Sequence, residues 1–184
     1  MAMVDLLKRL EGLLNREAIR HCLMRYSRAI DRVDEALLRE VYWPEAIDNH
    51  GSYNGSADGF ISWVIPMLGT MTQTAHFLGN ILIEVENNCA RCETYFIAFH
   101  RLTGPHGEPK EIHVIGRYLD RMEKRSDEWR LLLRNVAYDG VMEVDHPVDW
   151  AKRTFDLDYE SHRFPDDVSY QIFSDGRLHP PQVP

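Results

Sequence analysis

The sequence predicts an α+β fold in which N-terminal helices cover one face of an antiparallel sheet. Up to Gly69, apolar residues recur every three or four positions, which is the period of an amphipathic helix. From residue 73 they recur at every second position, which is the period of a strand. Helices followed by strands, rather than helices alternating with strands, is the order typical of an α+β protein.

Two helices are predicted at the start of the chain. The first is short and carries leucines at helical spacing, namely Leu6, Leu7, Leu10, Leu13 and Leu14. Asn15 is placed to cap the second helix, whose apolar stripe runs from Ile19 to Ile30. Asp31 then begins a charged stretch that interrupts the stripe.

Two further helices and a short strand follow. Asp34 is placed to cap a third helix over residues 35–42. Residues 45–55 indicate a short strand and a turn. Ser56 is placed to cap a fourth helix, which Pro66 breaks or kinks.

Four long strands are predicted after this helical part. Each is separated from the next by a turn signal such as Asn87-Asn88, Gly104–Gly107 or Ser126-Asp127. The strands are expected over residues 73–85, 89–102, 111–122 and 129–138.

The length of 184 residues favours one domain with an extension. We place the domain at residues 1–145 and the extension at 146–184. A helix over Val148–Phe155 is predicted within the extension. Because the extension keeps aromatic residues such as Phe164 and Tyr170, we expect it to pack against the domain or a neighbouring subunit.

Composition and charge exclude several classes of partner. The net charge of −8 opposes binding to a phosphate backbone, so nucleic acid is not an expected partner. No apolar run is long enough to span a bilayer, and no membrane partner is expected. The charged N-terminus lacks the core of a signal peptide, and three cysteines do not form a disulfide framework. We therefore expect a cytoplasmic protein.

Three residues could form an acid–base site. A carboxylate at Asp31 could orient the imidazole of His76, with the phenol of Tyr26 beside it. Each has an ordinary alternative: Asp31 as a solvated helix end, Tyr26 as core, and His76 as a strand histidine bonded to a carbonyl. At a helix C-terminus the dipole disfavours a carboxylate, so a buried Asp31 would have a raised pKa unless an imidazolium balanced it.

The recognisable catalytic motifs of other classes are missing. The Cys89–Cys92 pair lies in a predicted strand without a second pair, which indicates a structural role. The histidines follow no metal-ligand pattern, and no phosphate-binding or dinucleotide-binding glycine motif is present. A serine nucleophile acting with His76 and Asp31 stays open, although no nucleophile-elbow sequence supports it.

The ordered motifs resemble those of a known superfamily. They are Arg16-Glu17-Ala18-Ile19 before Asp31, then Thr74-Ala75-His76-Phe77-Leu78-Gly79-Asn80, then Gly116-Arg117-Tyr118 followed by a turn and Trp129. Over about residues 10–140 the chain resembles the nuclear transport factor 2-like superfamily. It is most similar to the SnoaL-like branch with scytalone dehydratase, hexachlorocyclohexane dehydrochlorinase and bile-acid 7α-dehydratase. The resemblance implies a cone: a curved sheet wrapped around helices, with an interior pocket.

The resemblance also implies roles for single residues. Asp31 and His76 match the catalytic pair of the family. Tyr26 matches the catalytic tyrosine of the bile-acid dehydratase, and Arg134 matches the assisting arginine of the dehydrochlorinase. Candidate substrate-binding residues are His50, Tyr53, Asn80, His100 and Tyr118.

The expected function is that of a lyase without a cofactor or a metal, acting on a mostly apolar cyclic small molecule. The reaction would be a dehydration or a related elimination in which His76, oriented by Asp31, is the general base. The alternatives are an isomerase or cyclase in the same pocket, and a non-catalytic small-molecule-binding or assembly subunit. A homo-oligomer is expected from the relatives, with a trimer favoured and a dimer possible.

Overall fold

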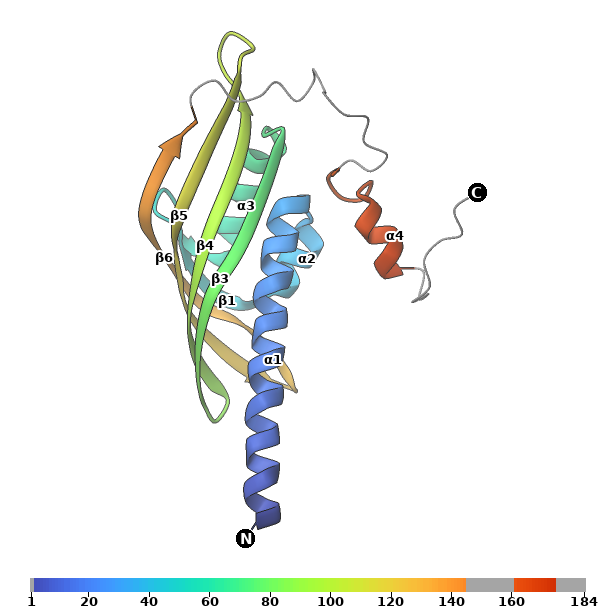
Figure 1. The fold of residues 1–184 in the computed structure, drawn as a ribbon, viewed down its shortest axis with the longest axis vertical. Coiled ribbons are helices and arrows are strands. Elements are labelled where there is room, and N and C mark those ends of the chain that lie inside the picture. Colours follow the sequence, from blue (N-terminus) through green and yellow to red (C-terminus); the bar gives the residue numbers. More distant parts are fainter. Residues whose placement is uncertain (1, 145–160, 175–184) are drawn as a thin grey trace.

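The structure is a computed structural model that describes residues 2–144 and 161–174 (Figure 1). Its elements follow the expected order of helices first and long strands afterwards. The helices are α1 (Ala2–Arg32), α2 (Glu35–Glu40), α3 (Ala57–Gly69) and α4 (Val168–Ser174). The strands are β1 (Tyr42–Asn49), β2 (Asn54–Ser56), β3 (Gln73–Glu86), β4 (Cys89–Thr103), β5 (Pro109–Arg125) and β6 (Glu128–Glu143).

The strands form one curved sheet in the order β2-β1-β6-β5-β4-β3. Strands β3 to β6 form an antiparallel meander, as predicted. One pairing departs from the expected antiparallel sheet, because β1 pairs with β6 in parallel. The pairing joins Asp48 to Arg134 across a long stretch of sequence, and local patterns do not reveal such a partner.

The helices cover one face of this sheet, which we call the inner face. Helix α1 packs mainly on β3 and helix α3 on β1. The ring of Tyr26 on α1 and the ring of Phe60 on α3 both contact Tyr42 of β1. The two helices therefore share one aromatic core. Among the described residues, no helix lies on the opposite face of the sheet, which we call the outer face (Figure 1).

Helix α1 is a single helix of 31 residues, where the sequence predicts two. Asn15 caps no helix, because its side chain accepts a hydrogen bond from Trp129 Nε1 at 3.1 Å. The five leucines before it are 46–71% exposed. The N-terminal part of α1 extends past the sheet (Figure 1). At about 100° per residue these leucines lie on the side of α1 opposite to the buried stripe that follows. The apolar residues therefore change sides within one helix, and in the sequence this change looks like the boundary between two helices.

The caps predicted at Asp34 and Ser56 and the four long strands are confirmed. Asp34 accepts a hydrogen bond from Leu37 N at 3.0 Å, and Ser56 accepts one from Gly59 N at 3.1 Å. Helix α2 ends at Glu40, before the predicted end at residue 42, because Tyr42 already belongs to β1. The helix predicted over 148–155 lies outside the described residues. Within the described part of the chain, no helix is long and apolar enough to cross a membrane.

Candidate active site

Asp31 lies in the last turn of α1, where the backbone leaves the helix abruptly. Val33 adopts a left-handed conformation with φ of 54°, which is uncommon for a β-branched residue. Asp34 N then donates to Ala29 O at 2.9 Å, closing the helix end. This termination turns the chain away directly after Asp31 and leaves its carboxylate facing β3.

His76 lies on β3 and contacts Asp31 at two points. The ring Nδ1 is 2.7 Å from Oδ1 of Asp31, and the backbone N–H of His76 donates to Oδ2 at 2.8 Å. The His76 side chain is 8% exposed and that of Asp31 is 12% exposed. Because a carboxylate only accepts hydrogen bonds, the network places a proton on Nδ1 of His76.

The electrostatic surroundings favour an ionised Asp31. Burial acts to raise the pKa of this carboxyl, but the hydrogen bonds and the charge of His76 outweigh burial and hold the pKa below its ordinary value. The unfavourable helix dipole expected at this position is therefore overcome by His76.

His100 on β4 lies next to His76. The two ring centroids are 5.6 Å apart and the rings are perpendicular. Burial, with a contribution from the charge of His76, lowers the pKa of His100 to about 4. His100 is therefore neutral at physiological pH and lies beside the His76 ring.

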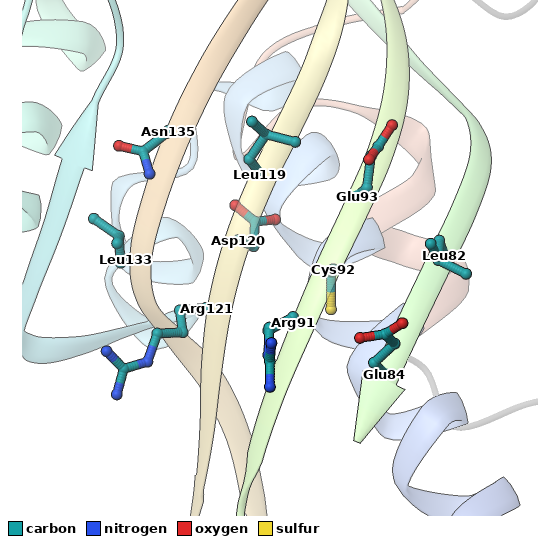
Figure 2. Close-up of a pocket in the computed structure, with 10 residues that line it drawn as sticks. All are labelled: Leu82, Glu84, Arg91, Cys92, Glu93, Leu119, Asp120, Arg121, Leu133 and Asn135. Carbon is teal, nitrogen blue, oxygen red and sulfur yellow. The ribbon is translucent and has the colours of Figure 1, made fainter. Parts of the chain in front are cut away.

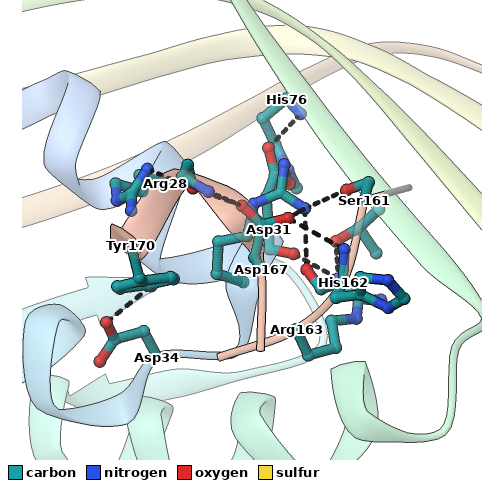
Figure 3. A network of polar contacts seen from close by, with 12 residues as sticks. Arg28, Asp31, Asp34, His76, Ser161, His162, Arg163, Asp167 and Tyr170 are labelled. Atoms are coloured by element: carbon teal, nitrogen blue, oxygen red, sulfur yellow. Dashed lines mark hydrogen bonds and ion pairs between the residues drawn. The ribbon is translucent and has the colours of Figure 1, made fainter. Parts of the chain in front are cut away.

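The C-terminal segment 161–174 packs against the end of α1 and the start of β3 (Figure 3). Arg163 donates hydrogen bonds to the backbone oxygen of Asp31, to Thr74 Oγ1 at 2.9 Å and to Met71 O at 3.3 Å. Tyr170 donates to Asp34 Oδ2 at 2.7 Å. Arg163 thus joins the two elements that carry Asp31 and His76, and no local pattern in the sequence predicts this contact.

The same C-terminal segment makes further polar contacts along α1 (Figure 3). Arg28 donates to Ser169 at 3.0 Å, and its guanidinium lies 4.3 Å from the ring centre of Tyr170. Arg32 is hydrogen-bonded to Ser161 and lies 3.6 Å from the carboxylate of Asp167. The segment is therefore attached to α1 at several separate points.

A second histidine–carboxylate pair lies at β1, and sequence reasoning found only its histidine. The Nδ1 of His50 is 3.0 Å from Asp48 Oδ1, and the hydroxyl of Tyr42 donates to Asp48 Oδ2 at 2.5 Å. His50 stacks on Phe60 with ring centroids 4.7 Å apart. The spacing of Asp48 and His50, two residues apart where β1 ends at Asn49, was the available signal.

Arg134 lies in the core, which does not fit the assisting role expected from the resemblance. Its side chain is 0% exposed and forms a two-point ion pair with Asp120 at 2.7 and 2.8 Å. The guanidinium lies about 4 Å from the ring centres of Tyr26 and Tyr118. Among the described residues, Arg134 Nη1 has no hydrogen-bond partner.

Tyr26 and Tyr118 share this enclosure and are each 1% exposed. Their rings pack edge to face, 5.6 Å apart. The ordinary alternative for Tyr26, core packing, is the one that the structure supports. Burial likewise corrects the expectation that Tyr118 contacts substrate.

Two other predicted binding residues are placed differently from expectation. Asn80 is exposed at an irregularity in the β3–β4 pairing, so it does not line the inner face. Tyr53 is half-buried, stacks on Trp63 and donates its hydroxyl to Ser56 O at 2.9 Å. Its phenol is therefore occupied by the turn before α3.

A shallow hollow of about 340 Å³ lies on the outer face of the sheet (Figure 2). Charged side chains such as Glu84, Arg91 and Arg121 line it beside Leu82 and Leu133. Neither His76 nor His50 is among its lining residues. Residues 2–144 and 161–174 contain no group of three or more His, Cys, Asp or Glu placed to hold a metal ion.

Comparison with known proteins gives one family. The profile of a family described as "SnoaL-like domain" matches residues 11–135. No protein with a curated description matches the sequence.

Solved structures with the same fold come from several bacteria. Hexachlorocyclohexane dehydrochlorinase LinA-type3 from Novosphingobium barchaimii is 18% identical, with a TM-score of 0.64 and coverage of 76% of this chain and 96% of that one. A protein from Novosphingobium aromaticivorans, provisionally named a scytalone dehydratase, is 20% identical, with a TM-score of 0.66 and coverage of 73% and 90%.

A third structure is a nuclear transport factor 2-like superfamily protein from Salmonella enterica. It is 19% identical, with a TM-score of 0.60 and coverage of 71% of this chain and 94% of that one. At these identities the similarity shows the fold: an α+β cone with a curved, unclosed sheet.

Proposed function

This chain belongs to the SnoaL-like domain family, and from that premise we propose that it is a lyase that needs no cofactor. Its substrate would be a mostly apolar cyclic small molecule. The reaction would be a dehydration or a related elimination, the class that the names of the dehydratase and dehydrochlorinase neighbours indicate for those proteins. General acid–base chemistry alone can perform such a reaction.

The observation that supports this proposal best is the double contact between Asp31 and His76. One carboxylate oxygen holds the ring Nδ1 at 2.7 Å and the other holds the backbone N–H at 2.8 Å. Fixing the ring through Nδ1 leaves Nε2 as the basic nitrogen. Among the described residues, Nε2 of His76 has no hydrogen-bond partner.

In the proposed reaction, His76 Nε2 removes a proton from a substrate carbon. The electrons of that bond form a carbon–carbon double bond, and the bond to a hydroxyl or halide on the next carbon breaks. Asp31 stabilises the imidazolium that forms, because its ionised carboxylate lies against Nδ1. Shielding from water strengthens this interaction.

The experiment that tests the proposal is a turnover assay with hydroxylated and halogenated cyclic compounds. Mass spectrometry would follow the loss of water or of hydrogen halide, and His76→Ala serves as the inactive control. An isomerase would instead give a product of unchanged mass. Binding without any turnover would favour the non-catalytic alternative, and crystals soaked with the same compounds would locate the ligand relative to His76.

We also propose that the chain assembles with copies of itself, with a trimer expected. Large apolar side chains on the outer face support this, since Phe77 and Leu82 are each 63% exposed. Light scattering would report the mass of the assembly, and a monomeric mass would contradict the proposal.

A further inference from the structure

We propose that the start of helix α1 is an interaction surface that pairs, in parallel, with the same helix in other copies of this chain. The surface is the apolar side of residues 2–14, which we call the leucine face. It consists of Met3, Leu6, Leu7, Leu10, Leu13 and Leu14. The inference goes beyond the proposed lyase activity. It rests on the proposed self-assembly, for which it names a contact outside the sheet.

The leucine face has the spacing of a helix that packs against other helices. Its members occupy the first, fourth and fifth positions of a seven-residue repeat that begins at Met3. At about 100° per residue they form a stripe about 120° wide, which is the width of the buried side of a helix in a bundle. All six side chains are nevertheless 46–71% exposed. The leucine face is therefore patterned for burial but is not buried within one chain.

The leucine face points away from the sheet of its own chain. Ile19 follows Leu10 by two and a half turns, lies about 180° round the helix from it, and is fully buried. Arg28 follows Leu10 by about five full turns, points the same way, and bonds to Ser169 of the C-terminal segment at 3.0 Å. This side of α1 is thus covered near its end by the C-terminal segment. It is uncovered at its start, where the helix extends past the sheet (Figure 1).

The size of the leucine face suits a contact between copies. An exposed apolar patch of several hundred Å² is near the upper limit for a monomeric protein. Two leucine faces in contact would bury on the order of 1,000 Å², which reaches the lower limit for a specific protein interface. Every residue from 2 to 11 is exposed, and a helix that lacks packing is marginal in water at about this length. A partner helix would supply that packing.

The charges beside the leucine face favour a parallel arrangement of the helices. Arg9 lies on one flank and Glu11 on the other, each about 100° from Leu10. Among the described residues, neither side chain has an ion-pair partner. In a parallel pair, or in any parallel ring, opposite flanks meet, so Arg9 of one copy faces Glu11 of the next. In an antiparallel pair like flanks meet, and Arg9 would face Arg9.

The charge of the polar side argues against a lipid surface as the partner. Helices that lie on membranes are rich in lysine and arginine on their polar side. Here Lys8, Arg9 and Arg16 are nearly balanced by Asp5 and Glu11. The whole chain carries a net charge of −8, which opposes an anionic membrane. A second copy of the chain is the occupant that the charges favour.

The first test changes one residue at the centre of the leucine face. Leu10→Glu should weaken self-association of the full chain by about 30-fold or more, measured by sedimentation over a range of concentrations. The matched control is Met24→Glu, because Met24 is also half exposed on α1 (50% against 46% for Leu10) but lies outside the leucine face. Met24→Glu should associate like the wild-type protein, and turnover per chain should be unchanged in both variants.

The second test exchanges the flanking charges. Arg9→Glu should weaken association by about three- to tenfold, because it places like charges opposite each other. Adding Glu11→Arg restores the opposite charges and should restore association. An unchanged Arg9→Glu variant, or a double variant that is not restored, would overturn the parallel pairing.

Leu82→Glu on the outer face separates this inference from the wider proposal of self-assembly. If Leu82→Glu abolishes association and Leu10→Glu does not, the sheet carries the contact and the leucine face does not. A wild-type protein that is monomeric at every concentration would overturn both, without bearing on the lyase activity, which the turnover assay tests. A monomer that sediments with vesicles of phosphatidylcholine and phosphatidylserine, unless Leu10 is replaced by Glu, would show that a membrane is the partner and overturn the inference.

Discussion

The carboxylate of Asp31 bonds to both the ring and the backbone of His76, at 2.7 Å and 2.8 Å. One side chain on α1 therefore fixes the position of β3 and the orientation of the imidazole that β3 carries. The stability of the fold and the proposed activity both depend on this contact. Variants of Asp31 and His76 can therefore test each of the two.

Asp31→Asn should lower the free energy of unfolding by about 1–3 kcal/mol at neutral pH, because a charged hydrogen bond is lost. The pKa of Asp31 is lower in the folded than in the unfolded protein, since His76 outweighs burial. The contribution is therefore complete above the unfolded value of about 3.8 and is lost as the pH falls through the folded value. Urea unfolding should show a constant difference between the two proteins from pH 7 to about 4 and convergence as the pH falls below 4; a difference that persists to pH 2 would contradict the assignment.

His100 should make stability depend on pH in a different window. Burial lowers its pKa from 6.5 to about 4, so between these values the unfolded chain binds a proton that the folded protein does not. Stability should fall as the pH falls from 6.5 to 4, by at most about 3 kcal/mol. His100→Gln should flatten this part of the curve. An unaltered slope would mean that another group titrates there.

Arg134→Met should destabilise the protein by about 3–5 kcal/mol, because it leaves the carboxylate of Asp120 buried without its partner. Adding Asp120→Val removes the unpaired charge and should restore most of the loss. The double variant should keep its activity, since Arg134 lies in the core. A double variant that folds but is inactive would contradict this and indicate that Arg134 takes part in catalysis.

Arg163→Ala should loosen the contact between α1 and β3, because Arg163 bonds to the backbone of Asp31 and to Thr74. We expect the amide of His76 to exchange with deuterium about 5–10-fold faster, which corresponds to about 1 kcal/mol of local stability. The matched control is Arg125→Ala, an arginine paired with Glu45 and Glu123 away from the site. Equal exchange in all three proteins would show that the C-terminal segment does not support the site.

Local features of the fold could be predicted from the sequence. The caps at Asp34 and Ser56 depend on neighbouring residues, and the long strands follow from a period of two. The continuity of α1 could not be predicted, because Asn15 bonds to Trp129, 114 residues away. The parallel pairing of β1 with β6 is likewise a long-range event.

The candidate site was predictable only in part, for the same physical reason. The pairing of Asp31 with His76 came from the resemblance, since no spacing within the chain joins a helix end to a strand. The burial of Arg134 depends on its pairing with Asp120, and that of Tyr26 on side chains of β1, β5 and β6. The sequence alone does not reveal either contact. Asp48 went unnoticed because its importance comes from Tyr42 and His50 meeting around it.

The most direct test of the central claim is the rate at which 3-hydroxycyclohexanone, in deuterated water, exchanges its α-proton and forms cyclohex-2-enone. Wild-type protein should accelerate both processes, Asp31→Asn should slow them by about 100-fold or more, and His76→Ala should abolish them with the fold intact. A His76→Ala protein that matches the wild-type rates would contradict the claim that Asp31 and His76 form the base.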